Sequence, residues 1–195
     1  MGAVYEVFDQ VTQSPRALKV MLPRVLESAE HRARFVREAQ LTGGIASEHL
    51  VRVLDAGFDA DAPFIVMELL RGEDLKSALA RRGRLEADEA LVLLRQAALG
   101  LEKTHAAGII HRDLKPANLF LAQRDDGSPC VKIVDFGVAK LAAHGAAEET
   151  DMVGTPLYMA PEQARGTGSI GARADLFSLA HVAHTMLVGE PYYAE

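Results

Sequence analysis

The chain has 195 residues, of which 49% are hydrophobic, 25% are charged and one is cysteine. This is enough apolar material for one sizeable core or two small ones, so we expect a folded globular protein. The net charge of −6 disfavours nucleic acid and anionic membrane surfaces as partners, because both attract basic proteins. The single cysteine cannot form an internal disulfide, and no secretory signal or membrane-spanning stretch is recognisable, so we expect a reducing, cytoplasmic setting.

The first 70 residues show the alternation of apolar and polar side chains that is typical of β-strands. Two strand pairs are expected around the polar turns at 10–15 and 59–62. A helix is expected at 25–41, where charged residues surround apolar positions until two adjacent glycines weaken the helix. The expected strands lie at 3–8, 16–21, 50–58 and 63–70.

Beyond residue 70 the pattern changes to longer helical segments, which suggests a division into parts 1–70 and 71–195. A short hairpin interrupts the helices, with strands at 119–122 and 131–134 around a turn that contains Asp126-Gly127. The apolar stretch at 176–188 is too short to span a bilayer, and we expect it to be a buried helix. The expected helices lie at 74–82, 87–107 and 175–187.

The densest group of chemically active side chains flanks this hairpin. The segment His111-Arg112-Asp113-Leu114-Lys115-Pro116-Ala117-Asn118 places an acid, a cation and an amide in one irregular loop directly before a strand. Asp135-Phe136-Gly137 starts 17 residues after Asn118, at the end of the second strand, so the two loops must lie side by side. The alternative interpretation of the first loop is a polar loop with self-satisfied turns, and a bare Asp-Phe-Gly is more often a turn than a metal site. Their order and spacing together favour a site, in which we expect His111 to brace the first loop.

With these two loops the sequence resembles the eukaryotic-type protein kinases. The segment at 154–158 and Lys115 are similar to the serine/threonine branch, and the stretch at 158–166 resembles bacterial members. The resemblance implies an α+β, two-lobed fold, with a small β-rich N-lobe at 1–70 and a mainly helical C-lobe at 71–195. Further motifs in the family's order are Ala17-Leu18-Lys19, Glu38, Met67-Glu68-Leu69-Leu70 and Ala160-Pro161-Glu162.

The resemblance implies a serine/threonine protein kinase that transfers the γ-phosphoryl group of ATP to Ser and Thr hydroxyls of protein substrates. Such chemistry depends on positioning and on charge neutralisation around a triphosphate. By the resemblance, Asp113 accepts the proton of the substrate hydroxyl, and Lys115 offsets the charge that grows on the transferred group. Asn118 and Asp135 are the implied ligands of Mg²⁺, which prefers oxygen atoms such as theirs.

The ATP site implied by the resemblance draws on both parts of the chain. Lys19 contacts the α- and β-phosphates only if Glu38 holds its flexible side chain. We therefore expect this pair to switch the kinase on and off, because separating the two residues would abolish productive ATP binding. Asp74 has two open interpretations, a contact with the ribose hydroxyls or the N-terminus of a helix, where carboxylates are favoured. The other implied positions are Gly2 in the glycine-rich loop, Val4 and Ala17 over the adenine, Phe120 beneath it, Met67 as gatekeeper, and the backbone of Glu68 and Leu70 at the adenine edge.

A regulatory role is implied for Arg112, because kinases with an arginine beside the proposed base are commonly switched by a phosphate in the activation segment. Thr150 is the only hydroxyl residue between Gly137 and Gly154, so we expect it to be the phosphorylation site. The acidic side chains at 148, 149 and 151 weaken this hypothesis, and Thr150 is otherwise a solvated loop residue. Thr155 belongs to a Gly-Thr motif that shapes the substrate site in the family.

Two features of the ends leave an alternative function open. The chain begins at the position that resembles the last glycine of the glycine-rich loop, so we expect the first strand and the loop tip to be missing. It stops after the helix that contains Asp175, so we expect an incomplete C-lobe. The alternative is therefore a catalytically impaired, pseudokinase-like module for nucleotide binding or interaction. A small-molecule phosphotransferase is disfavoured, since those enzymes lack the Gly-Thr and Ala-Pro-Glu segments.

Overall fold

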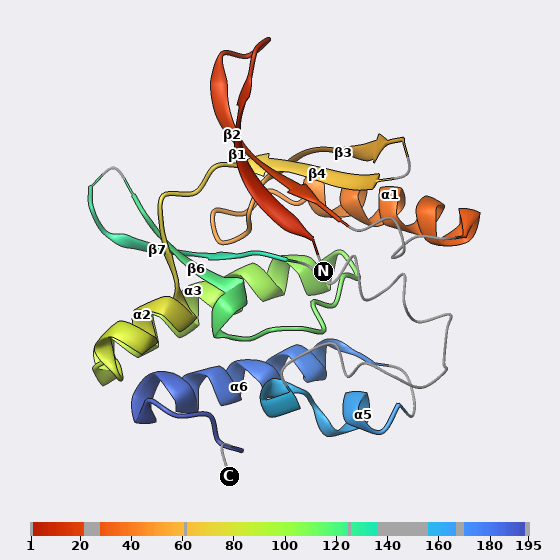
Figure 1. Ribbon diagram of the computed structural model, residues 1–195. Coiled ribbons are helices and arrows are strands. Elements are labelled where there is room, and N and C mark those ends of the chain that lie inside the picture. Colours follow the sequence, from red (N-terminus) through yellow and green to blue (C-terminus); the bar gives the residue numbers. More distant parts are fainter. Residues whose placement is uncertain are drawn as a thin grey trace. The chain divides into compact units, whose positions relative to one another are not determined.

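The computed structural model describes residues 2–21, 28–60, 62–124, 126–135, 156–166 and 170–193 (Figure 1). These residues form two compact units. The first unit contains the described residues up to 46 together with 51–70, and the second contains 47–50 and the described residues from 71 onward. None of the helices in these ranges is long and apolar enough to cross a membrane.

An antiparallel sheet in the order β1-β2-β4-β3 forms the first unit. Both predicted strand pairs are confirmed, although β2 begins two residues earlier than expected. Pro15 therefore lies inside β2, opposite Phe8 of β1. The pairing of β2 with β4 begins only at Arg16, so among the described strands Pro15 is paired with β1 alone. Proline, which has no N–H to donate, is tolerated at such an edge position. The strands are β1 (Ala3–Asp9), β2 (Ser14–Val20), β3 (Val53–Asp59) and β4 (Ala62–Glu68).

Helix α1 (Ala29–Gly43) packs against β3 within the first unit (Figure 1). The hydroxyl of Ser28 caps its first turn by accepting the N–H of His31 at 3.1 Å. Phe35 faces inward, and its ring meets the ring of Phe58 on β3 edge to face at 5.5 Å. The helix ends at the glycines that predicted its end, and the expected first residues at 25–27 lie outside the described residues.

The second unit combines a small antiparallel sheet, in the order β5-β6-β7, with helices. The predicted hairpin is confirmed as β6 and β7, within two residues of the expected bounds. Strand β5 was not predicted, because three residues are too few to show an alternating pattern. The elements are β5 (Gly72–Asp74), α2 (Leu75–Arg82), α3 (Ala87–Ala106), the 3₁₀ turn η2 (Pro116–Asn118), β6 (Leu119–Gln123), β7 (Pro129–Ile133), the 3₁₀ turn η3 (Pro156–Tyr158), α5 (Pro161–Ala164) and α6 (Ala172–Val188).

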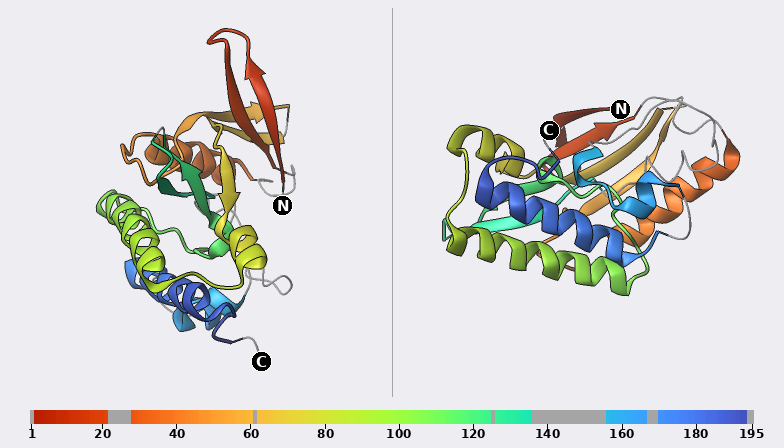
Figure 2. Two further views of the ribbon diagram at one scale, coloured as in Figure 1. Left: turned by 90° about the vertical axis from the view of Figure 1, so that its left-hand side faces the viewer. Right: turned by 90° about the horizontal axis from the view of Figure 1, so that it is seen from below.

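The expected buried helix is present as α6, but the helix is buried on one face only. Leu176 and Val188 are 53% and 55% exposed, so one face of the helix is open. The opposite face packs against α3, which runs beside α6 (Figure 2). The apolar content of a segment does not show how many faces of the helix are buried, because exposed apolar residues are common on protein surfaces. The buried residues of α6 are Ala174, Asp175, Ser178, Val182, Thr185 and Met186.

Strand β7 contacts β6, α3 and the segment 47–50 within the second unit. One edge pairs with β6, and α3 packs against the strand. On another side the N–H of Ile133 donates to the carbonyl of His49 at 2.9 Å, and Leu50 forms a parallel bridge with Ile133. The residue that approaches this segment from α3 is Gly100, where an added Cβ would lie 2.9 Å from the His49 carbonyl oxygen and 2.9 Å from the Ile133 side chain.

This close approach predicts that Gly100→Ala destabilises the protein, although alanine favours a helix over glycine by about 1 kcal/mol. We expect a loss of roughly 1–3 kcal/mol in the free energy of unfolding, the usual effect of overpacking. Gly43→Ala is the matched control in α1, because its added Cβ would come no nearer than 3.5 Å to any neighbouring atom. Urea denaturation measures both effects. Equal stabilisation by the two substitutions would contradict the packing described here.

Candidate active site

The loop that joins α3 to β6 is built around the buried ring of His111. Its Nε2 donates to the carbonyl of Val134 at 3.0 Å, and its Nδ1 accepts the N–H of Asp113 at 3.3 Å. These two bonds require a neutral ring with its proton on Nε2. Burial lowers the pKa of His111 and so favours the same neutral form. The prediction that His111 braces the loop is confirmed.

Arg112 adopts a backbone conformation that residues with a side chain rarely take. Its φ is +63°, in the left-handed region. The N–H of Arg112 donates to Asp175 Oδ1 at 2.8 Å, and its carbonyl accepts the side-chain amide of Gln163 at 2.9 Å. Backbone strain of this kind persists only where surrounding contacts hold it, and here both polar atoms of the residue are held.

The carboxylate of Asp113 is held by two other side chains of the same loop. Lys115 Nζ donates to Asp113 Oδ2 at 2.9 Å, and the two side chains are 17% and 20% exposed. The amide nitrogen of Asn118 donates to the backbone carbonyl of Asp113 at 2.7 Å and to Oδ2 at 3.3 Å. Because its nitrogen faces Asp113, the oxygen of the Asn118 amide points away from Asp113.

Asp135 follows β7, and the structure brings this strand end beside the first loop. The N–H of Val134 donates to the carbonyl of Asn118 at 3.0 Å, so the two loops lie side by side as the sequence predicts. Asp135 is exposed and has a φ of +58°, the second left-handed residue of the site. Its neighbours Phe136 and Gly137 lie outside the described residues, as do Thr150 and Thr155.

Asp175 of α6 is a functional residue that sequence reasoning missed. It is 0% exposed, and its two carboxylate oxygens accept the backbone N–H groups of His111 at 2.9 Å and Arg112 at 2.8 Å. His105 Nε2 of α3 also donates to it at 2.7 Å. The available signal was a single carboxylate in an apolar helix, because buried charges in proteins almost always have partners.

The predicted phosphate-binding residues of the first unit lie on its sheet and helix. Lys19 of β2 stands opposite Val4 of β1 and Ile65 of β4. Glu38 lies on α1 and is half-buried. Gly2 precedes β1, and an added Cβ there would lie 2.0 Å from the carbonyl oxygen of Val20, so this position accepts only glycine.

The predicted adenine-binding residues also divide between the units. In the first unit, Ala17 and Met67 are buried cross-strand neighbours on β2 and β4. The N–H of Glu68 donates to the carbonyl of Arg52 at 3.0 Å. Leu70 follows β4 and is half-buried.

In the second unit, Asp74 of β5 and Phe120 of β6 are cross-strand partners. The carboxylate of Asp74 caps α2 by accepting the N–H of Ser77 at 2.9 Å and its hydroxyl at 2.7 Å. The structure therefore contains the helix N-terminus that was one of two interpretations of Asp74. A contact with ribose stays a prediction.

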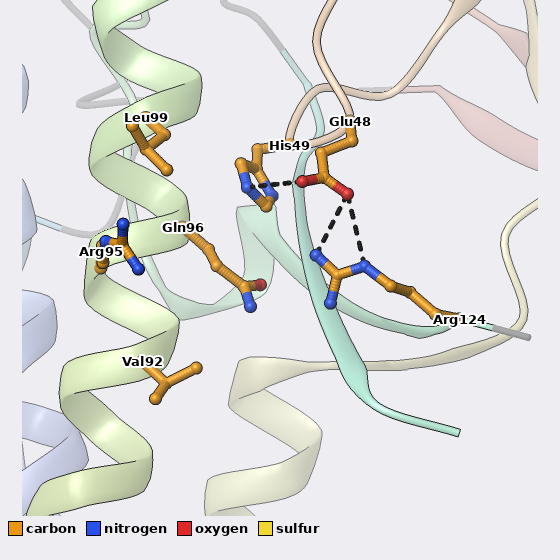
Figure 3. Close-up of a pocket in the computed structure, with 7 residues that line it drawn as sticks. All are labelled: Glu48, His49, Val92, Arg95, Gln96, Leu99 and Arg124. Carbon is orange, nitrogen blue, oxygen red and sulfur yellow. Dashed lines mark hydrogen bonds and ion pairs between the residues drawn. The ribbon is translucent and has the colours of Figure 1, made fainter. Parts of the chain in front are cut away.

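A cavity of about 270 Å³ lies in the second unit, away from the predicted catalytic residues (Figure 3). Its walls are α3, the segment 47–50 and the start of the β6–β7 turn. Glu48 lies between two of the lining side chains, with Arg124 at 3.1 Å from one carboxylate oxygen and the His49 ring at 3.4 Å from the other (Figure 3). These contacts fasten the segment 47–50 to the hairpin that carries Asp135.

The sequence comparison identifies the family. The chain matches the protein kinase domain family over residues 1–195, and it belongs to that family. It is 40% identical over 195 residues to the serine/threonine-protein kinase PknA of Corynebacterium glutamicum, a match that covers 97% of this chain and 40% of the relative. It is 36% identical over 194 residues to PknD of Mycobacterium tuberculosis, covering 99% of this chain and 28% of the relative. The chain thus spans less than half the length of these relatives.

The comparison with solved structures confirms the α+β protein kinase fold. The kinase domain of Mycobacterium tuberculosis PknI matches with a TM-score of 0.77 and 30% identity, over 98% of this chain and 71% of that one. A structure of Rad53 in complex with AMP-PNP matches with a TM-score of 0.80 and 25% identity, over 100% of this chain and 46% of that one. The predicted resemblance to bacterial serine/threonine kinases is therefore confirmed.

The buried neutral ring of His111 predicts a pH-dependent stability. Because the folded-state pKa is lowered, the unfolded chain takes up a proton as the pH falls below about 6.5, while the folded chain resists it. The contribution of His111 to the free energy of unfolding is thus complete above about pH 6.5 and is lost below it, by up to about 1.4 kcal/mol per pH unit. His111→Gln should remove this component. Urea denaturation from pH 7.5 to pH 5 checks it, and parallel profiles for the two proteins would contradict it.

Proposed function

We propose that the protein is an ATP-dependent serine/threonine protein kinase that phosphorylates hydroxyl groups of protein substrates. The observation that carries the proposal is the loop in which Lys115 and Asn118 both donate to the carboxylate of Asp113, beside the strand end that carries Asp135. Family membership and the serine/threonine kinases among its relatives support it. Residues 1–70 and 71–195 would be the two lobes of the domain.

Asp113 is the proposed catalytic base. Its carboxylate is oriented by Asn118 and Lys115 and so can accept the proton of a substrate hydroxyl while it aims the oxygen at the phosphorus atom. Lys115 stays within hydrogen-bond distance of the same carboxylate, where its positive charge offsets the negative charge that develops during transfer. Neither residue forms a covalent bond in this role, because phosphoryl transfer requires mainly positioning and charge stabilisation from the protein.

The donor set of the second unit fits Mg²⁺. The amide oxygen of Asn118 points away from Asp113, and Asp135 presents an exposed carboxylate at the end of β7. These are hard oxygen ligands, of the number that Mg²⁺ usually takes from a protein when phosphate oxygens and water complete its shell. When bound, Mg²⁺ would neutralise phosphate charge.

The first unit would supply the remaining contacts to ATP. Lys19 would bind the α- and β-phosphates with Glu38 as its partner, and Gly2 and Val4 would lie along the nucleotide. Ala17, Met67, Phe120 and the backbone of Glu68 and Leu70 would surround the adenine, and Asp74 would meet the ribose hydroxyls, as in the family. Regulation through Arg112 and Thr150, and the role of Thr155, stay predictions, since both threonines lie outside the described residues.

Two substitutions separate catalysis from metal binding. Asp113→Asn keeps the size of the side chain but removes the base, so kcat should fall by a factor of about 100 or more while ATP affinity changes little. Asp135→Asn should instead weaken the binding of Mg²⁺ and ATP together. Phosphate transfer from labelled ATP to a Ser- and Thr-containing protein, and nucleotide binding by calorimetry with and without Mg²⁺, measure the two effects.

Asp88→Asn is the control, because Asp88 is an exposed carboxylate in the first turn of α3. It should leave both transfer and binding unchanged. An Asp113→Asn variant that keeps activity within about tenfold of the wild type, equivalent to roughly 1.4 kcal/mol, would show that Asp113 is not the base. Binding of ATP by the wild-type protein without any transfer would favour the non-catalytic nucleotide-binding alternative.

A further inference from the structure

Gln163 of α5 reaches across to the loop that carries the proposed base. Its side-chain nitrogen donates to the carbonyl of Arg112 at 2.9 Å, and its side-chain oxygen accepts the N–H of Ala160 at 3.2 Å. The orientation of the amide is determined by these two partners. A flipped amide would place its nitrogen against the N–H of Ala160 and its oxygen against the carbonyl of Arg112, so both bonds would be lost.

The carbonyl that Gln163 holds belongs to the peptide unit directly before the side chain of Asp113. The N–H of the same peptide unit donates to Nδ1 of His111 at 3.3 Å. Both polar ends of the unit are therefore fixed, one by Gln163 and one by His111. Rotation of this unit would change ψ of Arg112 and φ of Asp113, and it would redirect the Asp113 carboxylate.

Asp175 does not restrain this peptide unit. Its carboxylate oxygens accept the N–H groups of His111 and Arg112, which belong to the two preceding peptide units. Asp175 thus anchors the start of the loop, and the carbonyl of Arg112 depends on a different side chain. Among the described residues, Gln163 donates its side-chain N–H to the carbonyl of Arg112.

We propose that Gln163 is a positioning residue for the proposed base, because it fixes the Arg112–Asp113 peptide unit and with it the direction of the Asp113 carboxylate. The inference rests on the proposed kinase function and adds a residue outside the catalytic loop to it. Gln163 lies two residues after Pro161, in the short helix α5, so the orientation of Asp113 depends on this helix being in place. A displacement of α5 that breaks the bond would leave a folded protein with a misdirected base.

The competing explanation is that Gln163 merely caps α5 through the N–H of Ala160. Gln163→Glu distinguishes the two roles, because a carboxylate still accepts that N–H but cannot donate to the Arg112 carbonyl. Gln96→Glu is the matched control. The amide of Gln96 also bridges two backbone groups, accepting the N–H of Val131 at 2.7 Å and donating to the carbonyl of Pro129 at 3.2 Å, so the same substitution removes the same kind of bond elsewhere in the unit.

The experiment compares steady-state phosphate transfer by the wild-type protein, Gln163→Glu and Gln96→Glu at pH 7.5. For Gln163→Glu we expect kcat to fall between about tenfold and a hundredfold, with KM for ATP within about threefold of the wild type, because misplacement affects transfer more than nucleotide binding. Gln96→Glu should keep both constants. Wild-type kcat in Gln163→Glu, or an equal fall in Gln96→Glu, would overturn the proposal.

Hydrogen exchange provides a readout that does not depend on activity. Amides of the segment 109–118 should exchange faster in Gln163→Glu than in the wild type and in Gln96→Glu, because the restraint on the peptide unit is lost. Unchanged exchange in this segment would overturn the proposed restraint. If the wild-type protein transferred no phosphate, the kinase proposal would fail, whereas the exchange measurement would still decide whether Gln163 orders the loop.

Discussion

The buried carboxylate of Asp175 is the interaction on which the rest of the site depends. Two consecutive backbone N–H groups of the loop at 111–118 end on its oxygens, and the ring of His105 provides a third donor. A carboxylate that is removed from water is stable only when such donors surround it, so loop and helix require each other. The left-handed backbone of Arg112 follows from this requirement, since its N–H must point at α6 while the chain continues toward Asp113.

Local sequence patterns account for most of the fold. Alternation predicted the strand pairs of the first unit, and the Asp-Gly turn predicted the β6–β7 hairpin, because these signals depend on neighbouring residues. The exposed face of α6 and the three-residue strand β5 were not predictable in this way. They depend on which distant surfaces meet, a property that the periodicity of one segment does not contain.

The residues of the site also differ in whether a local sequence signal marks them. The residues whose spacing forms a motif, such as Asp113 and Asn118, could be identified from sequence because one loop holds them all. Asp175 and Gln163 contact the loop from positions 63 and 51 residues away from Arg112, and no spacing rule marks them. The sequence does show that Asp175 is a charged residue within an apolar helix. This signal indicates that the carboxylate has a buried partner, but it does not identify the partner.

The segment 47–50 has a consequence for any attempt to divide the chain. It packs in the second unit, although the residues on both sides of it belong to the first. The N–H of Ile133 on β7 therefore finds its acceptor in a stretch that comes more than 80 residues earlier, as His49. A fragment that starts at residue 71 would leave this edge of β7 without its neighbour, and open strand edges recruit other chains. Such a fragment should aggregate even though it carries the entire loop of the proposed base.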